Sequence, residues 1–284
     1  MMDNKRAGLV LEGGGMRGIY TAGVLDVIME NNIKFQGVMG VSAGAIHGSS
    51  YVSGQIGRNL RYYRKYCRDK RFMSIWNLLF TGDIAGEKFC YHTLPEKLDP
   101  YDYEAFNNSG IDFYAVCSNV ETGKPEYIQI RDMKKDIDVM RASASLPYVS
   151  RIVNTHGLKL LDGGCTDSIP VKAMLDKGYD KCVVVLTRHK GYVKKPEAMK
   201  AAGLFYGRYP KFIKAMDTRS EVYNNTLSYI EEKEAAGEIF VIRPSCELTI
   251  GRTEGNPEKL QEVYDIGYKD ACNALDLLKK YLLN

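Results

Sequence analysis

The sequence has few of the features that mark a disulfide-stabilised, metal-binding or redox protein. Its seven cysteines are odd in number and lie at least 17 residues apart, so they indicate neither a disulfide framework nor a CxxC motif. Only four histidines are present, and no cluster of His, Asp and Glu has the spacing of metal ligands. We therefore expect reduced thiols, no metal and no other cofactor.

Long hydrophobic runs are also missing. The first strand-like segment, of about five residues, is too short for the apolar core of a secretory signal, and no run could span a membrane. These absences favour a cytoplasmic protein whose membrane contact, if any, is peripheral. The net charge of +4 permits contact with an anionic membrane surface but does not call for a nucleic-acid partner. No feature of the sequence indicates the oligomeric state.

Linkers, internal repeats and low-complexity tracts are absent, and 45% of the 284 residues are hydrophobic. This composition predicts a single domain over residues 1–284 with an ample core. Within it we distinguish a motif-bearing core over about 7–190, a helical cap over about 191–236, and a C-terminal strand and helix over about 237–284.

Strand and helix signals alternate along the chain. This alternation predicts an α/β fold with a mainly parallel central sheet, organised as a three-layer α/β/α sandwich. The expected strands cover residues 8–11, 35–41, 113–119, 126–130, 151–161, 181–187 and 239–242. The expected helices cover residues 19–29, 43–54, 133–144, 199–236 with an interruption at Pro210, and 257–283. The basic stretch 58–71 is interpreted as a solvated helix face rather than a binding patch.

Two glycine clusters each lie between a strand and a helix. The second, Gly40-Val41-Ser42-Ala43-Gly44, places Ser42 on a tight turn, as expected of a nucleophilic serine. The first precedes a helix, and its glycines leave backbone N–H groups open to a developing oxyanion. The residues expected to form this oxyanion hole are Gly13, Gly14, Gly15, Met16, Arg17 and Gly18.

The first cluster also fits the dinucleotide-binding pattern G-x-G-x-x-G through Gly13, Gly15 and Gly18. That function needs an acidic residue at the end of the second strand, which here ends in Gly40-Val41-Ser42. The sequence therefore favours an acyl hydrolase, with a non-catalytic lipid- or nucleotide-binding protein as the alternative.

A serine nucleophile needs a base, and two residues are candidates. Asp162 ends a strand and is followed by Gly163 and Gly164, which allow a sharp turn and a close backbone approach. His189 follows a later strand and would complete a Ser42-Asp162-His189 triad in the chain order of α/β-hydrolases. The other histidines are less favourable, because His47 points away from Ser42 on the same helix and the remaining two lie outside any motif.

The motifs in this order and spacing resemble those of patatin-like phospholipases of the compact bacterial type, over residues 7 to about 190. They are the first glycine cluster, the Gly40–Gly44 cluster, Ala142-Ser143-Ala144-Ser145-Leu146-Pro147, and Asp162-Gly163-Gly164. The resemblance implies a serine acyl hydrolase of lipid esters, of phospholipase A, lysophospholipase or esterase type. It also implies that Ser42 is the nucleophile, that Asp162 is its partner in a dyad without histidine, and that residues 13–17 supply the oxyanion hole.

Two features depart from the family pattern. Glu12 stands where aspartate or a small residue is frequent, and we expect no catalytic consequence from it. The region after residue 190 matches only loosely, which leaves the acyl chain length, the head group and the balance between hydrolysis and transacylation open.

The segment 203–214 is amphipathic. Phe205, Tyr209 and Phe212 fall near one helical face and basic residues fall towards another, a pattern typical of a segment at a membrane interface, with a kink at Pro210. The alternative is a cap helix whose aromatic face packs over the catalytic cleft. Both interpretations predict that Phe205 and Phe212 lie near the path of the acyl chain.

Overall fold

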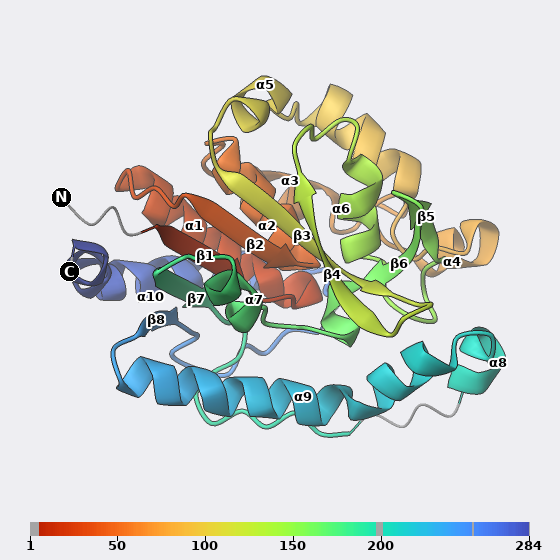
Figure 1. Cartoon of the computed structure of the whole chain (residues 1–284). Helices are drawn as coiled ribbons and strands as arrows, with labels where there is room; N and C mark the ends of the chain where they lie inside the picture. Colours follow the sequence, from red (N-terminus) through yellow and green to blue (C-terminus); the bar gives the residue numbers. More distant parts are fainter. Residues whose placement is uncertain (1–5, 197–200, 252, 284) are drawn as a thin grey trace.

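The computed structural model describes residues 6–196, 201–251 and 253–283, and in these ranges a sheet of eight strands lies between layers of helices (Figure 1). The strands are β1 (Ala7–Leu11), β2 (Gly37–Val41), β3 (Asp112–Asn119), β4 (Lys124–Ile130), β5 (Val153–Thr155), β6 (Leu158–Asp162), β7 (Lys181–Val185) and β8 (Ile239–Ile242). The neighbours in the order β3-β2-β1-β7-β8 are parallel. The antiparallel strands β4, β5 and β6 lie on the β3 side. The expected mainly parallel sheet is confirmed.

Helices cover both faces of this sheet. The longer ones are α1 (Ile19–Glu30), α2 (Ala43–Val52), α3 (Arg58–Tyr66), α9 (Pro210–Ala235) and α10 (Pro257–Leu283). The shorter ones are η1 (Gly15–Gly18), α4 (Ile75–Thr81), η2 (Phe89–Leu98), α5 (Tyr103–Asn107), α6 (Ile137–Ser143), η3 (Gly163–Cys165), α7 (Val171–Asp176) and α8 (Ala202–Tyr206).

The alternation of side chains along β1 explains the two helical layers. Leu9 and Leu11 point to one face and pack in a cluster with residues of α1, α2 and α10. Val10 points to the other face and packs with residues of α7 and α9. Both faces of the strand are therefore buried, as in other parallel sheets covered by helices, and the predicted three-layer arrangement is confirmed.

Some expected element boundaries were wrong. The expected interruption at Pro210 is confirmed, because α8 ends at Tyr206 and α9 begins at Pro210, where the missing N–H of proline costs no hydrogen bond. The helix expected from residue 133 begins at Ile137, because Asp132 accepts hydrogen bonds from the next backbone N–H groups and holds a turn there. Residues 199–200, the expected start of the cap helix, lie outside the described residues.

The structure also contains short helices between residues 75 and 107 that the sequence patterns did not predict. In the described ranges, no helix has both the length and the hydrophobicity that a membrane span requires.

Candidate functional site

Ser42 occupies a strained turn between β2 and α2. Its backbone has φ 54° and ψ −121°, a conformation that residues with a side chain rarely adopt. Two residues after Ser42 the chain requires a glycine, Gly44, since a Cβ atom there would collide with the carbonyl oxygen of Leu11. The Ser42 N–H donates to Ser143 Oγ at 3.0 Å, and this hydroxyl in turn donates to the Val116 carbonyl at 2.7 Å. The serine-rich segment before Pro147 thus fixes the turn to β3.

The register of β3 brings Ser42 and Asp162 together. Val41, at the end of β2, pairs with Val116, while Asp162, at the end of β6, pairs with the next residue, Cys117. Because β4 covers the opposite edge of β3, β2 and β6 approach along one edge from opposite directions. Their carboxyl ends therefore meet.

The Asp162 side chain is buried and held in place. Its Oδ1 accepts the Gly164 N–H at 2.7 Å, and its own N–H donates to the Ser145 carbonyl at 2.8 Å. Gly163 is needed because a Cβ atom there would collide with the Val116 carbonyl. Asp162 and Ser42 line the same cavity.

The first glycine cluster forms a loop next to this turn. Within the part of the chain that the structure describes, the N–H groups of Gly14, Gly15 and Met16 have no hydrogen-bond acceptor. Gly14 precedes η1, Gly15 and Met16 are its first two residues, and all three lie ahead of α1, whose dipole adds partial positive charge at this end. The loop thus offers several N–H donors to an anion.

Glu12 anchors the loop, which the sequence analysis did not anticipate. The carboxylate is buried, with Oε2 accepting the Thr187 N–H and Oε1 accepting the Tyr223 hydroxyl, each at 2.6 Å. Burial and the neighbouring Glu12 carboxylate raise the pKa of Tyr223 well above its usual range, so its phenol remains a donor. Glu12 therefore ties the loop to the end of β7 and to α9. In the sequence, the only sign of this role of Glu12 is its departure from the family pattern.

Two cavities meet at Ser42. We call the smaller one the polar cavity, because four cationic side chains and two carboxylates line it together with Ser42. The cations are Arg17, Arg188, Lys194 and Arg219, and the carboxylates are Glu12 and Asp162. Arg219 donates to the Gly164 carbonyl, and Asn224 bonds the Lys194 backbone at both its N–H and its carbonyl. The lining of the polar cavity thus carries more positive than negative side chains, and hydrogen bonds hold its backbone at Gly164 and Lys194.

The larger space, the apolar cavity, has a volume of about 160 Å³ and extends along α2. Ala43, Ile46 and Ser49 line it at successive turns, so it continues for roughly 10 Å beyond Ser42 at the helical rise. Most of its other walls are aromatic and aliphatic. Its shape and chemistry suit a hydrocarbon chain.

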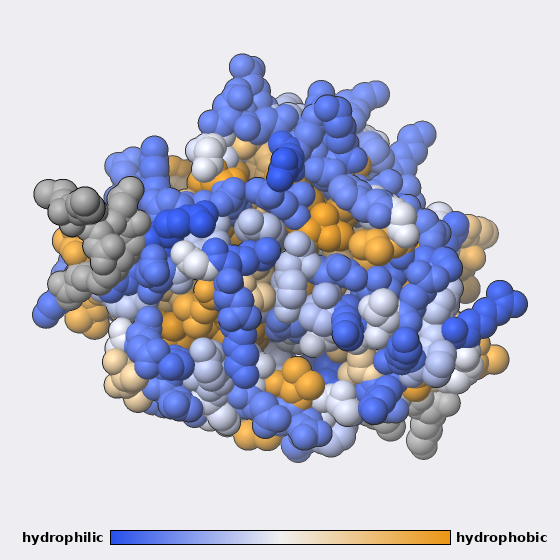
Figure 2. Space-filling model, in the orientation of Figure 1, coloured by the Kyte–Doolittle hydropathy of each residue, from blue (hydrophilic) through white to orange (hydrophobic). Residues whose placement is uncertain are grey.

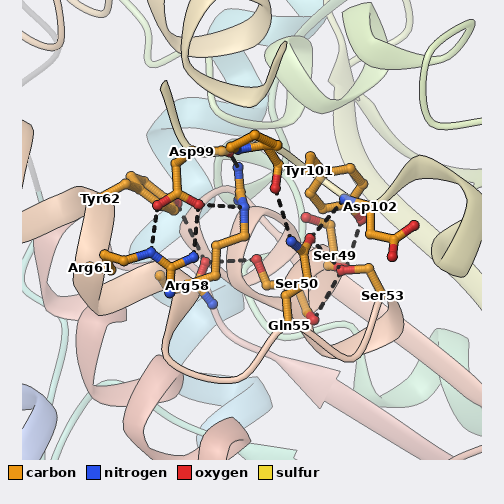
Figure 3. A network of polar contacts seen from close by, with 12 residues as sticks. Ser49, Ser50, Ser53, Gln55, Arg58, Arg61, Tyr62, Asp99, Tyr101 and Asp102 are labelled. Carbon is orange, nitrogen blue, oxygen red and sulfur yellow. Dashed lines mark hydrogen bonds and ion pairs between the residues drawn. The ribbon is translucent and has the colours of Figure 1, made fainter. Parts of the chain in front are cut away.

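A partly buried network of polar contacts borders the apolar cavity near Ser49 (Figure 3). Arg58 and Arg61 share the Asp99 carboxylate, with nitrogen-to-oxygen distances of 3.3 and 2.7 Å. The Tyr101 hydroxyl donates to the Ser49 carbonyl at 2.8 Å. The network joins α2, α3 and the segment after η2, and it puts a polar boundary on the cavity.

The histidines lie apart from this site. His189 does not line either cavity, and its Nδ1 contacts the Lys190 carbonyl at 2.8 Å. His47 is fully buried against Tyr63, with ring centroids 5.2 Å apart, and burial lowers its pKa to about 4. In the described ranges, no group of three or more His, Cys, Asp and Glu residues is arranged to hold a metal ion.

The segment 203–214 differs from the expected amphipathic face. Phe212 is fully buried and packs edge-on against Tyr206, which agrees with a packed aromatic face rather than with a membrane-facing one for this residue. Phe205 remains exposed on α8 and contacts Tyr148. Neither phenylalanine lines the two cavities at Ser42.

Comparisons with known proteins agree with the motifs. The family model described as patatin-like phospholipase matches residues 9–175, and a domain of unknown function (DUF6363) matches residues 209–283. An uncharacterized protein of Escherichia coli, YjjU, is 27% identical over 92% of this chain and 75% of its own length.

More distant relatives carry an enzymatic name. The lysophospholipase nte1 of Aspergillus terreus is 26% identical over 97% of this chain, which spans only 18% of that protein. The crystal structure of VipD from Legionella pneumophila aligns over 96% of this chain and 67% of its own chain, with a TM-score of 0.47 and 16% identity. The family match and the relatives named lysophospholipase support lipid ester hydrolysis.

Proposed function

Because the chain belongs to the patatin-like phospholipase family and is therefore a lipid ester hydrolase, we propose that it cleaves carboxylic esters of lipids through an acyl-enzyme on Ser42, with Asp162 as the base. The observation that carries this proposal is the meeting of the β2 and β6 ends on β3, which sets a strained serine beside a buried carboxylate.

The first half of the reaction forms the acyl-enzyme. Ser42 Oγ attacks the ester carbonyl carbon, and the carbonyl electron pair moves onto oxygen. The N–H groups of Gly14, Gly15 and Met16 donate to this oxyanion, at about 3 to 4 kcal/mol for each well-placed donor. Asp162 takes the serine proton and transfers it to the leaving alcohol when the ester bond breaks.

The second half regenerates the serine. A water molecule gives a proton to Asp162 and attacks the acyl carbonyl, and the proton then returns to Ser42 Oγ as the fatty acid leaves. A second alcohol, such as the hydroxyl of a lysolipid, could replace water, and the same site would then transfer the acyl group.

The two cavities suggest how the substrate lies. The apolar cavity holds the acyl chain along α2, and the alcohol part points into the polar cavity. The excess of cations there favours a leaving group that carries phosphate, as in a phospholipid or lysophospholipid. The runner-up mechanism adds His189 as the base, and it requires that side chain to move towards Ser42.

A fluorophosphonate probe tests the proposal. We expect it to label Ser42 on peptide mapping, and Ser42→Ala to lose both labelling and ester hydrolysis while circular dichroism and the melting temperature stay close to the parent. Ser228→Ala, an exposed serine on α9, is the matched control and should keep both. Labelling at another serine, or full turnover by Ser42→Ala, would remove the hypothesis.

A further inference from the structure

Helix α4 (Ile75–Thr81) carries its large apolar side chains on the outside. Ile75, Trp76, Leu79 and Phe80 are 59%, 50%, 69% and 79% exposed, and none of the seven residues of the helix is buried. The Trp76 and Phe80 rings stack with centroids 6.0 Å apart. Single exposed apolar residues are ordinary, but four on one short helix mark an interaction site.

The side of α4 that carries Asn77 faces the protein. At about 100° per residue the four apolar side chains fall within an arc of about 140°, and Asn77 lies outside it. Asn77 Nδ2 bonds the carbonyls of Arg71 and Ile84, each at 3.4 Å, and its N–H donates to the side chain of the N-cap residue Ser74. Most of the large apolar residues of α4 thus point outward, unlike those of an ordinary surface helix, while Asn77 and Leu78 are half-buried.

Contacts on both sides of the helix hold it in this position. Met73 and Ala85 form a bridge between the two flanking segments. Beyond the helix, the Ile84 N–H donates to the Val149 carbonyl at 2.8 Å, and Asp83 Oδ1 accepts the Arg151 N–H at 2.8 Å. These contacts on both sides of α4 therefore hold its apolar residues in their outward orientation.

The flanks of α4 also line the apolar cavity that contains Ser42, through Met73, Ile84 and Ala85. Figure 1 draws α4 at the right-hand end of the molecule, and Figure 2 shows hydrophobic atoms along that edge. Tyr148, the neighbour of Val149, packs against Phe205 of α8. A second exposed apolar patch, Leu204 and Phe205, therefore adjoins the segment that braces α4.

We infer that α4, with Leu204 and Phe205, is the surface by which this protein enters the interface of an anionic lipid membrane. Lys70 Nζ lies 6.0 Å from the Trp76 ring centroid, and Arg151 packs against Gly82 at the other end of α4. Exposed aromatic residues flanked by cations match the interfacial region of such a membrane. Six apolar residues fall well short of the roughly 20 residues per side that a stable protein interface uses.

This inference rests on the proposed function to the extent that a membrane presents the lipid substrate. Docking of α4 would place the flanks of the apolar cavity at the bilayer surface, so that an acyl chain could pass from the lipid phase into the cavity. The docking surface acts on aggregated substrate only. A short soluble ester should not depend on it.

Trp76 is the only tryptophan of the chain and reports directly on docking. The test uses full-length Ser42→Ala protein with vesicles of phosphatidylcholine and phosphatidylglycerol, so that no lipid is consumed. We expect the emission to shift to shorter wavelength and to become protected from an aqueous quencher. Unchanged emission under conditions where the protein sediments with the vesicles would show that another surface binds, and would overturn the inference. So would a failure to sediment at all.

Variants with intact Ser42 separate docking from chemistry. Trp76→Ala/Phe80→Ala should lower vesicle binding in sedimentation about tenfold or more and leave kcat/KM for a short soluble ester unchanged. Leu277→Ala, which removes a 64% exposed leucine on α10, is the control and should bind as the parent does. Equal binding by the double variant overturns the inference.

Two further outcomes have separate meanings. If the parent hydrolyses no ester while Trp76 still becomes protected by vesicles, the proposed function fails and the docking surface stands. If the parent self-associates in a concentration-dependent way that the double variant abolishes, and vesicles leave Trp76 emission unchanged, the patch binds a second copy of the chain and the inference is overturned.

Discussion

The two cavities that meet at Ser42 are built from different parts of the chain. Every residue that lines the apolar cavity lies between Gly15 and Leu146, within the region matched by the patatin-like family model. The polar cavity draws five of its lining residues from beyond that region: Arg188, Tyr192, Lys194, Arg219 and Tyr223. The difference suggests that the acyl side of the site is common to the family, while the side facing the leaving group depends on the C-terminal third of this chain.

The largest expected effect concerns Asp162, the proposed base, which lines the polar cavity together with Ser42. Asp162→Asn keeps the side-chain shape but removes the proton acceptor, so kcat should fall about 10²- to 10⁴-fold for every ester. His189→Ala should change kcat little. Steady-state rates on a soluble ester test this prediction. If His189→Ala is inactive and Asp162→Asn remains active, the result favours the Ser42-Asp162-His189 triad.

A large effect is also expected from filling the apolar cavity. Ser49→Met places a longer side chain in the cavity two helical turns beyond Ser42, so long-chain esters should lose about tenfold or more in kcat/KM while butyrate esters stay unchanged. Ser49→Ala keeps the space and is the control. The measurement is a series of esters from butyrate to palmitate. An equal loss across the series would mean that the acyl chain does not lie along α2.

A smaller effect is expected in the polar cavity. Arg188→Gln removes one cation, and kcat/KM for a lysophospholipid should fall about tenfold because a charge-assisted hydrogen bond to phosphate is lost. Hydrolysis of a monoacylglycerol should change little. Lys190→Gln, an exposed neighbour, is the matched control. An equal loss on both substrates would contradict phosphate binding by Arg188.

The last prediction concerns stability and lies outside both cavities. His47 is buried and its pKa is lowered to about 4, below the 6.5 of the free side chain. Between these values the unfolded chain binds a proton that the folded chain does not, so stability decreases as the pH falls through this window. The loss from about pH 7 to about pH 5 should be about 2 kcal/mol.

His47→Gln should remove that part of the pH dependence, as measured by urea unfolding at both pH values. Replacement of the exposed His92 by glutamine is the control and should retain it. If the His47 variant and the parent lose equal stability on acidification, another group is responsible.

Local motifs predicted much of the fold and of the candidate site. Ser42 follows a strand and precedes a helix, and Asp162 ends a strand before two glycines, so both positions follow from short stretches of sequence. The contacts between distant parts of the chain could not be predicted from such short stretches. Glu12 meets Thr187 and Tyr223 at separations of 175 and 211 residues, and no periodicity encodes a pairing of that kind.

Hydrophobic patterning did not determine the orientation of two segments. Phe212 fits both alternatives for the amphipathic segment, and the packing of α8 and α9 on the underlying strands buries it. No element was predicted over α4, where Ile75 and Leu79 are exposed while Asn77 is hydrogen-bonded to the carbonyls of Arg71 and Ile84. Hydrophobicity alone does not determine which face of a short helix is buried. The cytoplasmic location, the peripheral membrane contact and the single-domain organisation stay predictions.

The bonds of Glu12 have a consequence for the modular description of this chain. A family model that ends at residue 175 captures the carboxylate but neither of its partners, Thr187 and Tyr223. A fragment cut at that boundary would leave a buried anion without its donors, directly beside the glycine loop. The region that the family model matches is thus smaller than the region whose hydrogen bonds hold the glycine loop in place. Grafting or truncation should be planned from the hydrogen-bond map rather than from the extent of the match.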